Sequence, residues 1–112
     1  MEIHFATRKL ADNLSSDKQR VRVFGAVMAK KIGLRLNALT AARNLETMRA
    51  LPGGCHELHE DREGQLAVDL TGNQRFVFKP TEIPPPARDD GGLDWTAVTS
   101  VTILEVTDYH GK

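Results

Sequence analysis

Hydrophobic residues recur at every second position between residues 58 and 78, a spacing typical of β-strands with one buried face. The alternating residues are Leu58, Leu66, Val68, Leu70, Phe76 and Phe78. Two stretches rich in turn-forming residues, 61–64 (Asp-Arg-Glu-Gly) and 71–73 (Thr-Gly-Asn), interrupt the alternation. The pattern therefore predicts three strands joined by two tight turns within the segment 55–80.

The same pattern predicts how these strands pair. Placing Leu58 and Phe78 opposite Leu66 brings the large apolar residues onto one face, and a shift of one residue would scatter them. The opposite face then carries mostly polar side chains: Glu57, His59, Gln65, Ala67, Asp69, Arg75, Val77 and Lys79. We expect the functional residues on this polar face.

Helical periodicity precedes the sheet. After a short alternating strand at 2–6, Thr7 is placed to cap a helix that extends to about residue 14. A longer helix is predicted from 18 to 43, because apolar residues recur there at steps of three and four: Phe24, Val27, Met28, Ile32, Leu36 and Leu39. Its expected role is to cover the apolar face of the sheet.

The last third of the chain contains an interruption and a final strand. Residues 80–96 are rich in proline and glycine, which predicts an extended, mobile insertion loop. A β-branched run then predicts a strand over 98–106. Together the elements predict a single α+β domain over residues 1–112, with two N-terminal helices packed on one face of a mainly antiparallel β-sheet.

Composition narrows the class of protein. Hydrophobic residues make up 40% of the chain and charged residues 27%, as in ordinary globular proteins. No apolar run approaches the roughly 20 residues that a membrane span requires, so we expect no membrane association. A single cysteine, Cys55, excludes an internal disulfide and favours a cytoplasmic location.

Charge is unevenly distributed. Residues 1–50 contain ten Lys/Arg against four Asp/Glu, a net charge of +6, and residues 51–112 contain five against eleven, a net charge of −6. The overall net charge is +0, unlike that of strongly basic proteins that bind RNA without specificity. The basic half suits an anionic partner, or it is simply a solvated helical surface.

The segment 55–59, with Cys55, His56 and His59, invites a metal-binding interpretation, which the pattern disfavours. Residues an odd number of positions apart on a strand point to opposite faces, and no second cysteine cluster completes a tetrahedral site. We therefore expect no metal and no other cofactor.

The polar residues suit cleavage of RNA by its own 2′-hydroxyl. That reaction needs a base for the hydroxyl, a cation for the phosphate and an acid for the leaving 5′-oxygen. The candidates are His110, His59, Arg75, Arg62, Lys79 and Tyr109. Arg75 also has a purely structural alternative, an ion pair with Asp69 across the strands.

The chain resembles the HigB-type toxins of bacterial toxin–antitoxin modules, which belong to the RelE/ParE superfamily. The resemblance covers nearly the whole chain outside 80–96. It rests chiefly on the H-x-L-x-x-D-R-x-G-Q turn beginning at His56, the G-N-x-R-x-x-F strand and the terminal D-Y-H.

This resemblance implies a RelE-like two-layer fold and a metal-independent endoribonuclease that cuts mRNA on the ribosome. Arg75 would stabilise the phosphate, His110 would act as acid or base, and Tyr109 would position the substrate. His59, Arg62 and Lys79 would contact RNA. We accordingly expect His110 and Arg75 to open onto one shared cleft, and a cognate antitoxin with a helix-turn-helix domain to neutralise the toxin.

An alternative stays open. A weakly active or inactive member of the same fold would act only through protein partners, by binding an antitoxin or by inhibiting DNA gyrase as ParE-like relatives do. The acid–base residues favour cleavage, because a gyrase inhibitor needs none.

Overall fold

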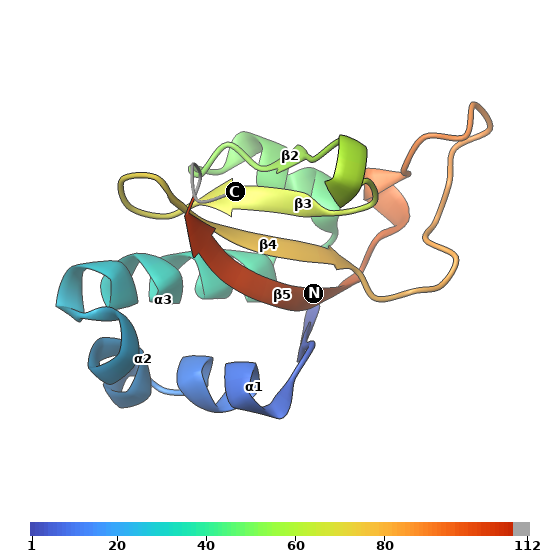
Figure 1. The fold of residues 1–112 in the computed structure, drawn as a ribbon. Coiled ribbons are helices and arrows are strands. Elements are labelled where there is room, and N and C mark those ends of the chain that lie inside the picture. The colour runs from blue at the N-terminus through green and yellow to red at the C-terminus, as the bar shows by residue number, and fades with distance from the viewer. Residues whose placement is uncertain (109–112) are drawn as a thin grey trace.

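A five-stranded sheet forms the centre of the protein, as seen in a computed structural model that describes residues 1–108. Its strand order is β1-β5-β4-β3-β2, with β1 parallel to β5 and every other pair antiparallel (Figure 1). The strands are β1 (Glu2–Phe5), β2 (His56–Glu57), β3 (Leu66–Asp69), β4 (Gln74–Pro80) and β5 (Ser100–Asp108). The predicted α+β class with a mainly antiparallel sheet is confirmed.

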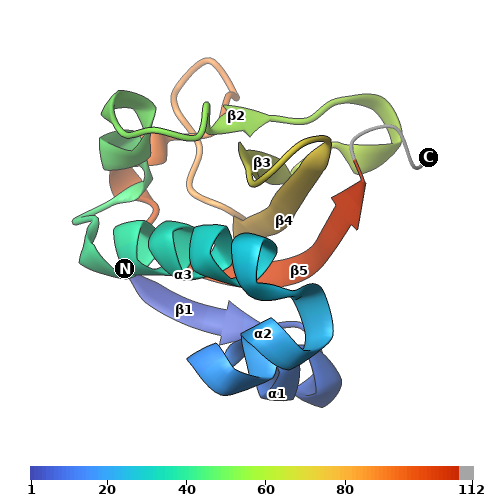
Figure 2. The same cartoon turned by 90° about the vertical axis from the view of Figure 1, so that its left-hand side faces the viewer.

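One face of the sheet is covered by helices. α3 (Ala26–Ala41) crosses that face, and α1 (Arg8–Leu14) and α2 (Asp17–Phe24) lie toward the β1 side (Figure 2). None of these helices is long and apolar enough to cross a membrane, and the same holds for the other helical turns of residues 1–108. Thr7 caps α1 as predicted, its hydroxyl accepting a hydrogen bond from the Leu10 amide at 3.1 Å.

The prediction of one long helix over 18–43 is wrong. Gly25 has a φ of 82°, and its amide donates to the Val21 carbonyl at 2.8 Å, which ends α2 before α3 begins. Only glycine adopts this left-handed backbone conformation without strain. The chain therefore has three N-terminal helices where two were expected.

The N-terminus closes the far end of α3. The Met1 ammonium donates to the carbonyls of Leu39, Thr40 and Ala42 at distances of 2.7–3.1 Å. A positive charge at a helix C-terminus satisfies carbonyls that lack a partner within the helix and interacts favourably with the helix dipole. This contact helps to fix α3 beside β1.

The core lies between α3 and the sheet. It contains the apolar sheet residues predicted for the buried face except Leu58, together with residues from two short 3₁₀ helices, η1 (Leu45–Ala50) and η3 (Trp95–Ala97). Its largest fully buried side chains include Phe76, Phe78, Ile32, Leu39, Leu45, Met48, Leu66 and Ile103. The long helix predicted to cover the apolar face does so through its α3 part.

The pairing of β3 with β4 is as predicted, but the pairing of β2 with β3 is not. Leu66 lies opposite Phe78 as expected, whereas Glu57, not Leu58, lies opposite Leu66 on the other side. This one-residue shift moves Leu58 onto the face away from α3, where it packs with Ala67 and Val77. β2 has only two residues, too few to fix its register by their own pairing. The register is decided instead by which side chain of the following loop becomes buried.

That loop is a 3₁₀ turn, η2 (Glu60–Arg62), in which Glu60 has a φ of 61°. Leu104 on β5 completes the small apolar cluster that Leu58 joins. The register also shifts between Val77 and Phe78, so that Glu105 faces Val77 and Ile103 faces Phe78. Leu104 is the extra residue of a β-bulge.

The insertion at 80–96 contains more structure than predicted. Ala87 and Leu93 form an antiparallel bridge, and the Arg88 amide donates to the Gly92 carbonyl at 2.7 Å. Trp95, at the end of the insertion, is only 3% exposed and belongs to the main core. The segment is therefore a small hairpin anchored by a buried aromatic ring.

Candidate functional site

We use the name open face for the sheet surface opposite α3, which carries His56, Asp69, Arg75 and Thr107. Arg75 lies directly opposite Asp69 on β3, as the sequence predicted, and directly opposite Thr107 on β5. Residues opposite one another in an antiparallel pair share a face, so these three side chains form one row across the sheet. Asp69 is exposed, whereas Arg75 and Thr107 are half-buried.

His56 extends this row onto β2. It lies opposite Ala67, two residues before Asp69 on β3, so His56 and Asp69 are diagonal neighbours on the open face. A hollow of about 430 Å³ lies here, lined by His56 and Asp69 together with Gly54, Leu70, Gly72, Asn73 and Gln74. A histidine and a carboxylate thus line one hollow at this end of the sheet, and the arginine lies next to the carboxylate on the following strand.

The hydrogen bonding of His56 selects its tautomer. Nδ1 lies 2.8 Å from the Gly54 carbonyl oxygen. A carbonyl only accepts hydrogen bonds, so Nδ1 carries a proton and Nε2 is the nitrogen that can exchange one with a bound substrate. His56 is exposed, which leaves such a substrate room to approach.

Sequence reasoning missed His56 because of the β2 register. The predicted pairing placed His59 on the polar face and His56 on the apolar one. The observed shift reverses this, and His59 instead stands as an exposed residue at the N-terminus of η2, off the sheet. The strand pattern gave no signal of the shift, because Leu58 can be buried on either face.

Arg62 is held against the sheet. Its Nη2 forms an ion pair with Glu105 Oε2 at 2.5 Å, and its Nη1 donates to Gln65 Oε1 at 2.9 Å. Glu105 faces Val77, two residues along β4 from Arg75. The ion pair therefore fastens the η2 loop across the open face and closes one side of the Arg75 row.

Lys79 lies apart from Arg75. It is half-buried near the other end of β4, opposite Thr102. Four residues of extended strand separate it from Arg75, about 13 Å at the usual rise per residue. Of the predicted substrate-binding residues, none is a direct neighbour of Arg75 in the ladder.

Tyr109 and His110 lie outside the described residues. β5 ends at Asp108, whose backbone pairs opposite Gln74, the neighbour of Arg75. The described part of the chain thus ends beside the Arg75 row.

The remaining candidate chemistry is weak. Within residues 1–108, no three His, Cys, Asp or Glu side chains gather in a way that could hold a metal ion. Burial raises the pKa of Cys55 to about 12, an effect that the nearby Arg49 only partly offsets. The thiol is protonated at neutral pH and is a poor nucleophile.

Comparison with known proteins gives a structural answer only. No protein-family model matches the sequence, and no curated protein matches it either. Among solved structures, the YoeB/ParE toxin from Agrobacterium tumefaciens is similar, with a TM-score of 0.59 at 17% identity, covering 98% of this chain and 100% of that one. The chain has the fold of these toxins.

A second solved structure agrees. The YoeB–YefM complex from Staphylococcus aureus gives a TM-score of 0.56 at 14% identity, covering 98% of this chain and 97% of that one. The likeness extends over all or nearly all of both relatives, so the predicted α+β fold, with helices packed on one face of the sheet, is the fold of these toxins. The finer resemblance to HigB stays a prediction from the sequence motifs.

Proposed function

We propose that this protein is the toxin of a type II toxin–antitoxin module and that it cuts mRNA on the ribosome without a metal. The observation that carries the proposal is the row of Asp69, Arg75 and Thr107 on the open face, with His56 beside it, in a chain with the YoeB/ParE toxin fold. The sequence motifs that resemble HigB toxins support the same conclusion. Ribosomes as the target imply a cytoplasmic location.

The proposed reaction needs only side chains. The 2′-oxygen of the RNA attacks the adjacent phosphorus while a base takes its proton. The bond from phosphorus to the 5′-oxygen then breaks, and an acid returns a proton to that oxygen. The products are a 2′,3′-cyclic phosphate and a free 5′-hydroxyl.

The phosphate-binding, base and acid roles each have a candidate residue, either on the open face or in the sequence after β5. The Arg75 guanidinium would hold the phosphate oxygens as charge builds up on them, because its planar fork fits two oxygens at once. His56 through Nε2, and His110 from beyond β5, would serve as the base and the acid. Tyr109 would position the substrate, and His59, Arg62 and Lys79 would guide the RNA strand.

The proposed partner is a cognate antitoxin with a helix-turn-helix domain, as the HigB resemblance implies. One of the similar solved structures is a complex, that of YoeB with YefM. The helical side of this chain offers a surface for such a partner, because four large apolar side chains are exposed on α2 and α3: Val21, Val23, Val27 and Leu34. Exposed apolar side chains that gather on one part of a surface mark interaction sites.

Replacement of Arg75 tests the proposed function. We expect Arg75→Ala to abolish growth arrest and to lower the rate of mRNA cleavage by about 10²–10³-fold, the usual cost of losing one preorganised charge contact. The matched control is Arg43→Ala, since Arg43 is an exposed arginine on the helical side of the chain. Mapping mRNA ends after induction, with and without a translation inhibitor, measures the effect.

The same experiment can reject the proposal. If Arg75→Ala stays fully toxic, or if its circular dichroism shows an unfolded protein, Arg75 has the structural role of an ion-pair partner. Intact mRNA together with altered plasmid supercoiling in the wild type would favour gyrase inhibition instead.

A further inference from the structure

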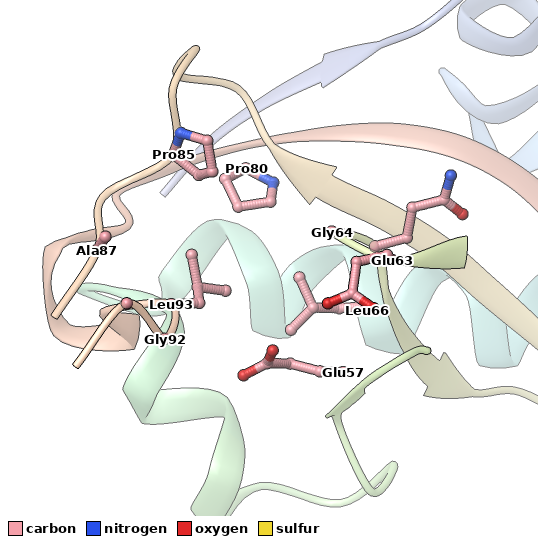
Figure 3. A pocket seen from close by; sticks show the side chains of 11 residues that line it. Glu57, Glu63, Gly64, Leu66, Pro80, Pro85, Ala87, Gly92 and Leu93 are labelled. Carbon is pink, nitrogen blue, oxygen red and sulfur yellow. The ribbon is translucent and has the colours of Figure 1, made fainter. Parts of the chain in front are cut away.

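A second pocket reaches Pro80, at the opposite end of β4 from Arg75. It has a volume of about 240 Å³ and lies between the β2–β3 region and the insertion hairpin (Figure 3). We call it the acidic groove and define it by Glu57, Glu63, Leu66, Pro80, Pro85 and Leu93. The insertion supplies Pro85 and Leu93, so the groove exists because of the segment that interrupts the sheet.

The groove combines two carboxylates with apolar walls. In Figure 3 the Glu57 and Glu63 side chains extend toward Leu66 and Leu93, and Pro80 and Pro85 lie across the pocket from Glu57. Among the described residues that line it, none is a lysine or an arginine. Such a site complements a cation carried on an apolar stem.

Glu57 is held in place for this role. Its Oε2 accepts a hydrogen bond from Trp95 Nε1 at 2.8 Å, and Trp95 is buried in the core. Oε1 remains as an acceptor for a ligand. Arg88, the cation of the hairpin, lies near enough to Glu57 for their charges to interact, but its hydrogen bonds go to other groups: its Nε pairs with Asp90 Oδ1 at 3.1 Å and its Nη1 donates to the Leu93 carbonyl at 3.4 Å.

The size of the groove selects the class of ligand. Sites for cofactors and drug-sized molecules usually occupy about 300–1,000 Å³, so 240 Å³ suits a single side chain better. A more open hollow of about 310 Å³ adjoins it, sharing Glu63 and Pro85 and adding Lys79, Glu82 and Ile83. Ile83 is 87% exposed, the most exposed of the large apolar side chains in residues 1–108.

We propose that the acidic groove binds an arginine side chain presented by an extended, basic segment of a partner protein. The guanidinium would lie between the Glu57 and Glu63 carboxylates, and its aliphatic stem would pack on Leu66 and Leu93. An apolar neighbour in the same segment would cover Ile83. Arginine fits better than lysine, because its fork bridges two carboxylates and loses less hydration on burial.

The groove is separate from the row of Asp69, Arg75 and Thr107, although Lys79, which would guide the RNA strand, lines the hollow beside it. Glu57 pairs opposite the core residue Leu66 and so lies on the helix-covered side of the sheet, whereas Arg75 lies on the open face. Carboxylates repel phosphates, so RNA is not the occupant. The inference therefore does not depend on the proposed function.

A peptide with the sequence Leu-Arg-Pro-Leu-Arg-Leu, labelled with fluorescein, tests the inference by fluorescence anisotropy. We expect the purified full chain to bind this peptide. Its affinity for the same peptide with citrulline in place of arginine should be at least about tenfold lower, because citrulline keeps the shape of arginine and loses its charge. The double variant Glu57→Gln with Glu63→Gln should bind the arginine peptide at least about tenfold more weakly. Glutamine at 57 still accepts the hydrogen bond from Trp95, so the fold is retained.

Glu60→Gln is the matched control, because Glu60 is exposed on the same loop and lines neither part of the groove. It should bind the arginine peptide as the wild type does. The inference is overturned if the wild type shows no binding at about 1 mM peptide, the weak end of specific binding. Equal binding of the citrulline peptide, unchanged binding by the double variant, or displacement by single-stranded RNA would overturn it as well.

Discussion

His56 and His59 are three residues apart in the sequence, but only His56 lies on the open face beside Asp69. We expect His56→Ala to lower mRNA cleavage about 10²-fold or more, the usual contribution of a general acid or base. His59→Ala should have a much smaller effect, because His59 lies off the sheet at the start of η2. Cleavage rates in a purified translation system measure both variants. A larger effect of His59→Ala would restore the role assigned to it from the sequence alone.

Whether the sequence predicts the position of a site residue depends on the length of the strand that carries that residue. Arg75 was placed opposite Asp69 correctly, because β3 and β4 are joined by a tight turn and every apolar residue agrees with their register. His56 was misplaced, because two residues of β2 carry too little pattern to fix a register. The ion pair of Arg62 with Glu105 could not be predicted either, since it joins a loop to a strand 43 positions later in the chain.

The η2 loop is an element whose stability depends on one apolar side chain. Leu58 is 9% exposed and packs with Ala67, Val77 and Leu104, which would otherwise face water. We expect Leu58→Ala to lower the free energy of unfolding by about 2–4 kcal/mol, the usual cost of a cavity in a core. Urea denaturation measures this as a shift of the midpoint at constant slope.

Leu34→Ala is the matched control for this element, because Leu34 is 51% exposed on α3. Its effect should stay within about 0.5 kcal/mol, as for most surface substitutions. If Leu58→Ala were equally mild, the loop would not be packed on the sheet, and the open face would extend further than the structure indicates.

The helices show why periodicity alone misreads a break. The apolar residues of 18–43 keep steps of three and four across Gly25, so the pattern predicts one continuous helix. The break comes from backbone conformation, which the apolar pattern does not record: Gly25 turns the chain so that α2 and α3 form a hairpin. The cap of the first helix, by contrast, was readable, because the Thr7 side chain itself forms the capping hydrogen bond.

At the scale of the whole molecule, opposite charges are carried by different parts of the fold. The first 50 residues, with a net charge of +6, form β1, the three helices and η1. The remaining residues have a net charge of −6, and those that the structure describes form the other strands and the insertion that builds the acidic groove. The basic charge is thus carried mainly by the helical elements and the acidic charge mainly by the later strands and the insertion, a division that suits partners of opposite charge.

The insertion joins the rest of the molecule through Trp95 rather than through its tip. Trp95 is 3% exposed, its ring lies under the Arg49 guanidinium with 3.7 Å from Cζ to the ring centroid, and its Nε1 donates to Glu57. By contrast, residues 82–85 and 87–91 are exposed. A long loop held by one buried side chain should tolerate substitutions among its exposed residues but not at the buried one.

Substitutions at the two ends of the insertion test this. We expect Trp95→Ala to lower the free energy of unfolding by about 3–5 kcal/mol, because it empties a core site and leaves the Glu57 carboxylate without its donor. Trp95→Phe keeps the ring and loses only the hydrogen bond, so its cost should be about 1 kcal/mol. Ile83→Ala, at the exposed tip, should cost almost nothing. Thermal unfolding should show this order, at about 4 °C per kcal/mol. If the Trp95→Ala and Ile83→Ala variants had the same melting temperature, Trp95 would not contribute to the core and the insertion would not be anchored by it.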